Sequence, residues 1–135
     1  MVAVTAKMVS ELRDATGVSM MECKKALVEA EGNRDRAIQL LRERGMASAQ
    51  KRAGRATNQG IVAAAVAGDG RTASLVEVNC ETDFVARNDQ FKAFVETLAQ
   101  DALKTDAPLA DTMKDAVTSM IQKTGENMQI RRNLR

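Results

Sequence analysis

The sequence contains no histidine, and three phenylalanines are its only aromatic side chains. Histidine is the most common general base and metal ligand in proteins, so its absence excludes every Cys–His and Ser–His nucleophile pair. Two cysteines, Cys23 and Cys80, cannot complete a four-ligand zinc site without histidine. No paired carboxylates stand out as an acid and a base. We therefore expect a protein with no catalytic residues for covalent chemistry and no zinc site.

Long apolar runs are also missing, and none approaches the roughly 18 residues that a membrane-spanning helix needs. The first residues lack the apolar core of a secretory signal, which favours a cytoplasmic, bacterial-type location or an organelle matrix. Reduced cysteines fit that location, and a bridge between Cys23 and Cys80 stays open as the alternative. The formal net charge is only +2, too small for a protein that binds nucleic acid by charge alone. We expect neither a membrane nor a nucleic acid as a direct partner.

What is present is the composition of a folded globular chain, with 44% hydrophobic and 28% charged residues. Apolar residues at helical spacing predict three short helices within residues 1–45. The first helix begins at about Thr5. Residues that cap or end helices mark the other limits: Thr16-Gly17, Ser19 with Glu22, Gly32, Asn33 and Gly45. Helices of about ten residues are not stable alone, so we expect them to pack into a bundle similar to the ubiquitin-associated fold.

Residues 46–59 begin with alanines and basic side chains and end in polar residues, which predicts a short basic helix and a linker. The pattern then changes to that of strands. Residues 61–67 and 72–79 form a predicted hairpin around Asp69-Gly70, and residues 128–131 alternate as a third strand. A hairpin alone is marginally stable in water, so we expect the third strand to join it.

Two further helices are predicted between the hairpin and the last strand. One runs from Phe84 to Lys104, and the other begins at Asp111 as its cap and continues through Lys123. The predicted fold class is therefore α+β. It comprises a three-helix bundle, a linker, and a core subdomain (60–135) in which about three antiparallel strands pack with two helices.

An acidic turn, Thr82-Asp83-Phe84-Val85, joins the predicted hairpin to the first of these helices, and it has two interpretations. In a structural interpretation, Thr82 caps the helix and Asp83 is a first-turn carboxylate favoured by the helix dipole. Phe84 then joins the core with Phe91, seven residues further on the same helix face. In a functional interpretation, ring and charge probe a partner protein, since one buried aromatic anchor contributes roughly 2 kcal/mol or more to an interface.

Met20 and Met21 are a second candidate contact. Adjacent helix positions diverge by about 100°, so at least one of the two side chains is expected to face outward. Methionine is flexible and polarisable, which suits either a partner surface or the filling of gaps in a core.

Two long segments, in order, resemble the two signatures of the elongation factor Ts family. Residues 12–27, LRDATGVSMMECKKAL, are similar to the first signature, and residues 77–87, EVNCETDFVAR, are similar to the second. Members of this family are nucleotide-exchange factors of elongation factor Tu. The resemblance implies a guanine-nucleotide exchange factor that needs no cofactor or metal of its own and makes or breaks no covalent bond.

The resemblance also implies roles for individual residues. The helical module would dock on the G domain of elongation factor Tu through Arg13, Met20 and Met21. The turn from Thr82 to Val85 would then reach the switch region, where Phe84 wedges between side chains. Asp83 would disturb the ligands of the bound magnesium and so weaken the binding of GDP.

Members of the family normally continue past the strand that resembles Ile130-Arg131-Arg132 into a second half of the core. We therefore expect reduced exchange activity from residues 1–135 alone. An exposed apolar face on residues 60–135 would indicate a surface that is covered in a longer protein. Short forms of the family can dimerise, so a homodimer stays open.

Two other classes of function remain as alternatives. Residues 1–45 could form a ubiquitin-associated type of peptide-binding module without exchange activity. The basic stretch around Lys51, Arg52 and Arg55 could associate with RNA, although no aromatic residues are interleaved with it for stacking on bases. The first alternative predicts ubiquitin binding that survives deletion of residues 56–135, and the second predicts an affinity that falls steeply with salt.

Overall fold

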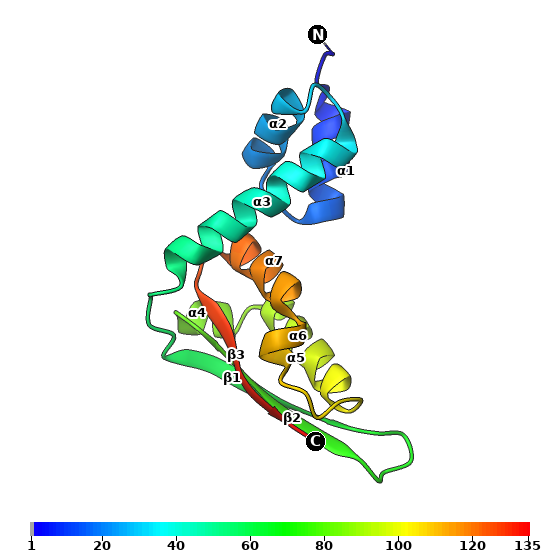
Figure 1. Ribbon diagram of the computed structural model, residues 1–135, viewed down its shortest axis with the longest axis vertical. Helices are drawn as coiled ribbons and strands as arrows, with labels where there is room; N and C mark the ends of the chain where they lie inside the picture. Colours follow the sequence, from blue (N-terminus) through cyan, green and yellow to red (C-terminus); the bar gives the residue numbers. More distant parts are fainter. Residues whose placement is uncertain (1) are drawn as a thin grey trace. The chain divides into compact units, whose positions relative to one another are not determined.

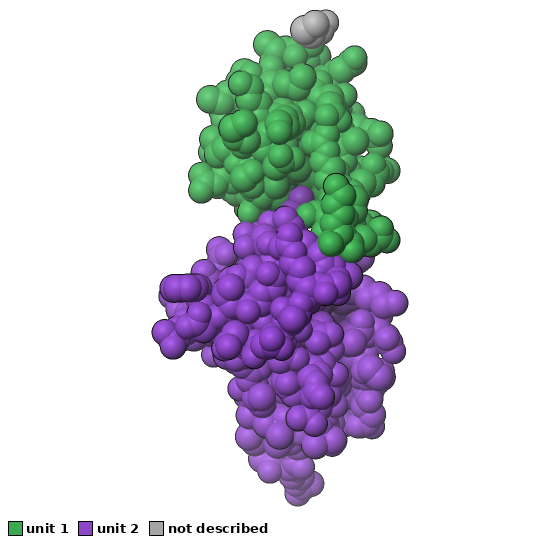
Figure 2. Space-filling view, turned by 90° about the vertical axis from the view of Figure 1, so that its left-hand side faces the viewer, with its two compact units in different colours: residues 1–51 green, residues 52–135 purple. Residues whose placement is uncertain are grey.

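The structure is a computed structural model that describes residues 2–135. The chain forms two compact units, residues 1–51 and 52–135, shown in green and purple in Figure 2. The first unit is helical and the second combines helices with an antiparallel sheet (Figure 1), so the predicted α+β class is confirmed.

In the described part of the first unit, three helices run over Ala6–Thr16 (α1), Met20–Glu29 (α2) and Arg34–Arg52 (α3). The predicted caps Ser19 and Asn33 are confirmed, and the structure adds Thr5 as the cap of α1. Thr5 Oγ1 accepts from the Met8 amide (3.2 Å), Ser19 Oγ from the Glu22 amide (3.4 Å) and Asn33 Oδ1 from the Arg36 amide (3.0 Å). The helices bury one apolar cluster: Val9, Leu12, Val18, Cys23, Ala26, Leu27, Ala30, Ala37 and Leu41.

The predicted end of the third helix at Gly45 is wrong, because α3 continues to Arg52. Ala37, Leu41 and Gly45 are all buried and four residues apart, so the glycine continues the buried stripe of the helix. A glycine inside a helix costs only about 1 kcal/mol relative to alanine. The alanines and long side chains after Gly45 are good helix formers and offset that cost, so residues 46–52 are helix.

Within residues 52–135, the sheet consists of Gln59–Val66 (β1), Ala73–Cys80 (β2) and Met128–Leu134 (β3), in the order β1-β2-β3 and antiparallel throughout. The predicted hairpin and third strand are thus confirmed. A bulge between Glu77 and Val78 shifts the register of the β2–β3 pair.

The helix α5 (Asp89–Ala102) packs against β1 and β2 and covers one face of the sheet (Figure 1). In β2, Ser74, Val76, Val78 and Cys80 are buried in alternation. The Ser74 hydroxyl donates to the Ala99 carbonyl of α5 at 2.6 Å, which joins the two layers through a buried hydrogen bond. The core of this unit therefore lies between the sheet and the helices.

The helix predicted from Phe84 to Lys104 is wrong as a single helix. The chain forms a short helix, α4 (Asp83–Ala86), and then starts α5 afresh. The interruption has a local cause, because Asn88 adopts an extended conformation and its Oδ1 accepts from the amides of Gln90 (2.8 Å) and Phe91 (3.2 Å). Asn88 is thus the N-cap of a separate helix.

The helix predicted from Asp111 is also two helices, α6 (Leu109–Thr112) and α7 (Lys114–Thr124), joined at Met113. Asp111 lies inside α6 and is not a cap. The start of α6 is fixed by a contact distant in sequence, because the Leu109 amide donates to Asn133 Oδ1 of β3 at 2.8 Å.

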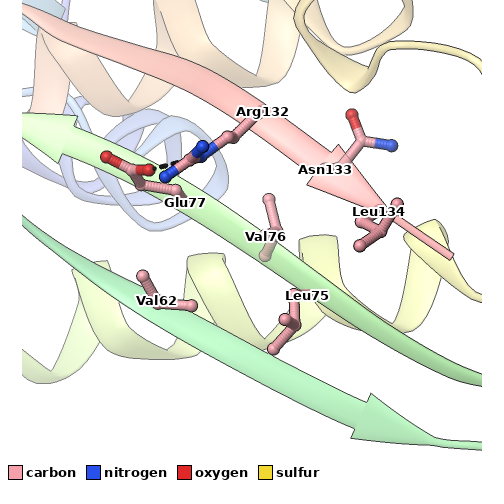
Figure 3. A pocket seen from close by; sticks show the side chains of 7 residues that line it. All are labelled: Val62, Leu75, Val76, Glu77, Arg132, Asn133 and Leu134. Atoms are coloured by element: carbon pink, nitrogen blue, oxygen red, sulfur yellow. Dashed lines mark hydrogen bonds and ion pairs between the residues drawn. The ribbon is translucent and has the colours of Figure 1, made fainter.

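The face of the sheet opposite to the buried side chains of β2 is apolar and open. Exposed Val62, Leu75 and Leu134, from the three strands, line a shallow hollow of about 450 Å³ (Figure 3). Beside them, Glu77 Oε1 accepts from Arg132 Nε at 2.9 Å. Hydrogen bonds from Asn79 and Arg132 lower the pKa of Glu77. The predicted possibility of an exposed apolar face is therefore met in residues 52–135.

Candidate functional site

The aromatic ring of the acidic turn is exposed. The Phe84 side chain is 83% exposed, whereas Phe91 is fully buried. The two rings do not share a helix face, because the chain breaks between α4 and α5. The structural interpretation of Phe84 as a core residue is therefore wrong.

Other parts of the structural interpretation are confirmed. Thr82 is the N-cap of α4, and its Oγ1 accepts from the Val85 amide at 3.3 Å. Asp83 is the acidic residue of the first turn. Its carboxylate is half exposed and forms an ion pair with Arg87, Oδ2 to Nη2 at 3.8 Å. Such an exposed pair is weak, so it leaves the Asp83 carboxylate available to another cation or donor.

The turn is anchored by a glutamate from the other end of the unit. The Thr82 amide donates to Glu126 Oε1 at 3.1 Å, and the Thr82 hydroxyl donates to Glu126 Oε2 at 2.6 Å. The Cys80 thiol donates to the Thr82 carbonyl at 3.3 Å. All three backbone and side-chain polar groups of Thr82 are thus used. Sequence reasoning missed the role of Glu126, and no local signal marks a contact across 44 residues.

A second acidic residue makes a parallel contact. The Asn127 amide donates to Glu81 Oε1 at 2.6 Å, and Arg55 Nη1 lies 3.5 Å from the same oxygen. The Asn127 side chain donates in turn to the Arg55 carbonyl at 2.7 Å. Residues 81 and 82 are therefore joined to residues 126 and 127 by side chains.

Both cysteines are free and buried. Burial raises the pKa of Cys80 to about 11, with a further contribution from the nearby Glu126 carboxylate. Burial also raises the pKa of Cys23. Since the thiolate is the nucleophile, these thiols are poorly suited to covalent chemistry.

In the first unit, Met20 and Met21 begin α2 and are 42% and 68% exposed. The expectation that at least one faces outward is confirmed. Both line a shallow groove of about 310 Å³ together with Val4, Thr5, Ala6, Val9 and Lys24. Arg13 is exposed in the last turn of α1. The predicted site residues thus form two groups, one in each unit.

Among residues 2–135, no cluster of three or more metal-ligating side chains is found. In the same range, no helix has both the length and the apolar character that crossing a bilayer requires.

Comparison with known proteins extends the resemblance of the two motifs. The family model described as "Elongation factor TS" matches residues 81–135. Elongation factor Ts of Arthrospira platensis is 54% identical, over 98% of this chain and 58% of that protein. The proteins of the same name from Hydrogenovibrio crunogenus and Clostridium tetani are 51% and 48% identical, each over 96% of this chain and 48% and 47% of their own lengths.

The chain thus spans about half the length of the curated relatives that it matches. The matches cover both compact units, and they include both motifs quoted above. Nearly the whole chain is therefore similar in sequence to proteins of the elongation factor Ts family, which confirms the resemblance.

Proposed function

We propose that this chain acts in translation elongation as a guanine-nucleotide exchange factor that promotes release of GDP from elongation factor Tu. The observation that carries the proposal is the exposed Phe84 ring, which lies next to a carboxylate on an anchored turn. A large exposed ring has no role in the core of this unit. Its position within the second family motif supports a role in partner contact.

In the proposed mechanism, Phe84 inserts between side chains near the switch region of the GTPase. Burial of a phenylalanine side chain contributes about 2 kcal/mol, which corresponds to roughly 30-fold in an equilibrium constant. The half-exposed Asp83 enters beside it and competes for the ligands of the bound magnesium. Loss of magnesium weakens GDP binding, because the ion neutralises the phosphates.

Thermodynamics sets one requirement on this mechanism. A ligand shifts an equilibrium only by its differential affinity for the two states, so the contacts of Phe84 and Asp83 must be stronger in the nucleotide-free state than in the GDP state. GTP then binds the emptied site and displaces the factor. The factor acts without a nucleotide site of its own and is not an enzyme of covalent chemistry.

The first unit supplies docking in this proposal. Met20 and Met21 offer a flexible apolar surface, and Lys24 adds positive charge beside them in the same groove. Arg13, exposed in the last turn of α1, is a further proposed contact of this unit. The alternative of a peptide-binding module without exchange activity concerns residues 1–45 alone. It explains neither the anchored turn nor the match of the family model to residues 81–135.

The test is release of a fluorescent GDP analogue from elongation factor Tu, with and without the chain. We expect acceleration that Phe84→Ala reduces by roughly 30-fold at equal concentration. Val66→Ala is the matched control, since Val66 is also an exposed apolar residue of this unit. No acceleration by the unaltered chain, with binding intact, would refute the proposal. A longer relative measured alongside should accelerate release more.

A further inference from the structure

We infer that Glu126 is a positioning residue for Phe84: its carboxylate holds the turn that carries the ring, and it does not itself touch the partner. The inference rests on the proposed function and assigns a role to a residue outside both family motifs. Glu126 lies in the connection between α7 and β3, and Phe84 lies in α4.

The contact extends one end of the β2–β3 pair in a regular way. The paired register of these strands ends at Cys80 opposite Met128. Beyond it, Glu81 bonds to Asn127 and Thr82 bonds to Glu126, so the same antiparallel order continues. Here, however, carboxylate oxygens receive the backbone amides in place of carbonyl oxygens. We call these four residues the acidic clasp.

The clasp determines the conformation of the turn. The Thr82 hydroxyl donates its only proton to Glu126, so its lone pairs are left to accept from the Val85 amide. Phe84 lies between the two residues that this relay fixes. Bonds to a carboxylate are charge-assisted and stronger than neutral ones, so the relay holds the turn firmly.

A helix of four residues has no stability of its own, because helix nucleation is unfavourable. Without the clasp, α4 would sample other conformations, and the orientation of the exposed Phe84 side chain would vary with them. With it, the ring is presented in one direction before any partner is met. Insertion of the ring, after the first unit has docked, then costs less conformational entropy, which is the usual benefit of preorganisation.

The experiment compares Glu126→Ala with Glu126→Gln in the full 135-residue chain. Glutamine retains one accepting oxygen but loses the charge. Exposed Glu96 on α5 supplies the control Glu96→Ala. Urea unfolding of each variant identifies any general loss of folding.

The first measurement is hydrogen exchange of the Val85 amide in the chain alone. We expect Glu126→Ala to accelerate it by about 10-fold relative to amides of α5, with Glu126→Gln intermediate and Glu96→Ala unchanged. An unchanged hydrogen-exchange rate of the Val85 amide in Glu126→Ala would overturn the inference, whether or not the chain accelerates GDP release.

The second measurement is the maximal rate of GDP release at saturating factor. We expect a loss of about 3- to 10-fold for Glu126→Ala and partial rescue in Glu126→Gln, with the half-saturating concentration little changed. Combined with Phe84→Ala, the Glu126→Ala substitution should cause no further loss, since it acts through the ring. Additive losses would overturn the inference. The unaltered chain could fail to release GDP while Glu126→Ala still accelerates hydrogen exchange at Val85. That result would refute both the proposed function and the positioning role, and the clasp would then have a structural role only.

Discussion

The two compact units both expose large apolar side chains, but they support them in different ways. Met20 and Met21 begin a ten-residue helix, and their flexible side chains line a shallow groove. Phe84 sits on a four-residue helix that is held from outside by the acidic clasp. Exposure alone therefore does not define a role. A soft side chain on a stable helix suits docking, and a rigid ring on an anchored turn suits insertion.

The largest expected effect is on the free energy of unfolding, and it distinguishes Phe91 from Phe84 in the second unit. Phe91→Ala should lower the free energy of unfolding by about 3–5 kcal/mol, because it leaves a cavity under the sheet. Phe84→Ala should change it by less than about 0.5 kcal/mol, as expected for an exposed side chain. Urea unfolding followed by circular dichroism measures both. Comparable losses would mean that Phe84 also supports the fold.

The next largest effect is a pH dependence of the free energy of unfolding, which arises from the buried Cys80 thiol beside the clasp. The Cys80 thiol ionises at a pKa of about 11 in the folded chain and at 9.0 without the fold. Between these values the unfolded chain releases a proton that the folded chain retains, so the free energy of unfolding falls as the pH rises. We expect a decline of up to about 2 kcal/mol between pH 9 and pH 11. The Cys80→Ala variant should lack this part of the decline, and an identical slope would contradict the assigned burial.

A smaller effect separates docking from insertion. Met20→Ala and Met21→Ala should each raise the half-saturating concentration for GDP release by about 5-fold, since each removes roughly 1 kcal/mol of apolar contact. The maximal rate should not change. Val28→Ala on the same helix, also exposed, is the control and should have no effect. A fall in maximal rate with unchanged half-saturation would mean that the first unit takes part in insertion.

Local signals explain which parts of the fold could be predicted from the sequence. The caps at Ser19 and Asn33 and the hairpin depend on residues within a few positions of each other. The interruption before α5 was also local, because Asn88 is a good N-cap, but the apolar spacing of Phe84 and Phe91 favoured one continuous helix. Gly45 favoured an end that the buried stripe of α3 overrides.

The candidate site was only partly predictable for a different reason. The residues of the turn carry their own signal, since a carboxylate beside one of three aromatic rings is unusual. The contacts that support the turn carry no local sequence signal, because Glu126 and Asn127 bond to Thr82 and Glu81 across more than forty residues. Which way Phe84 faces depends on that tertiary contact and on the break in the helix.

The most direct test of the account measures the affinity of the chain and of Phe84→Ala for elongation factor Tu in two states, with GDP and without nucleotide. Titration calorimetry gives both affinities. We expect Phe84→Ala to lose roughly 30-fold in affinity for the nucleotide-free state and less than about 3-fold for the GDP state. Equal losses in the two states would contradict this expectation, because a contact made equally in both cannot drive release of GDP.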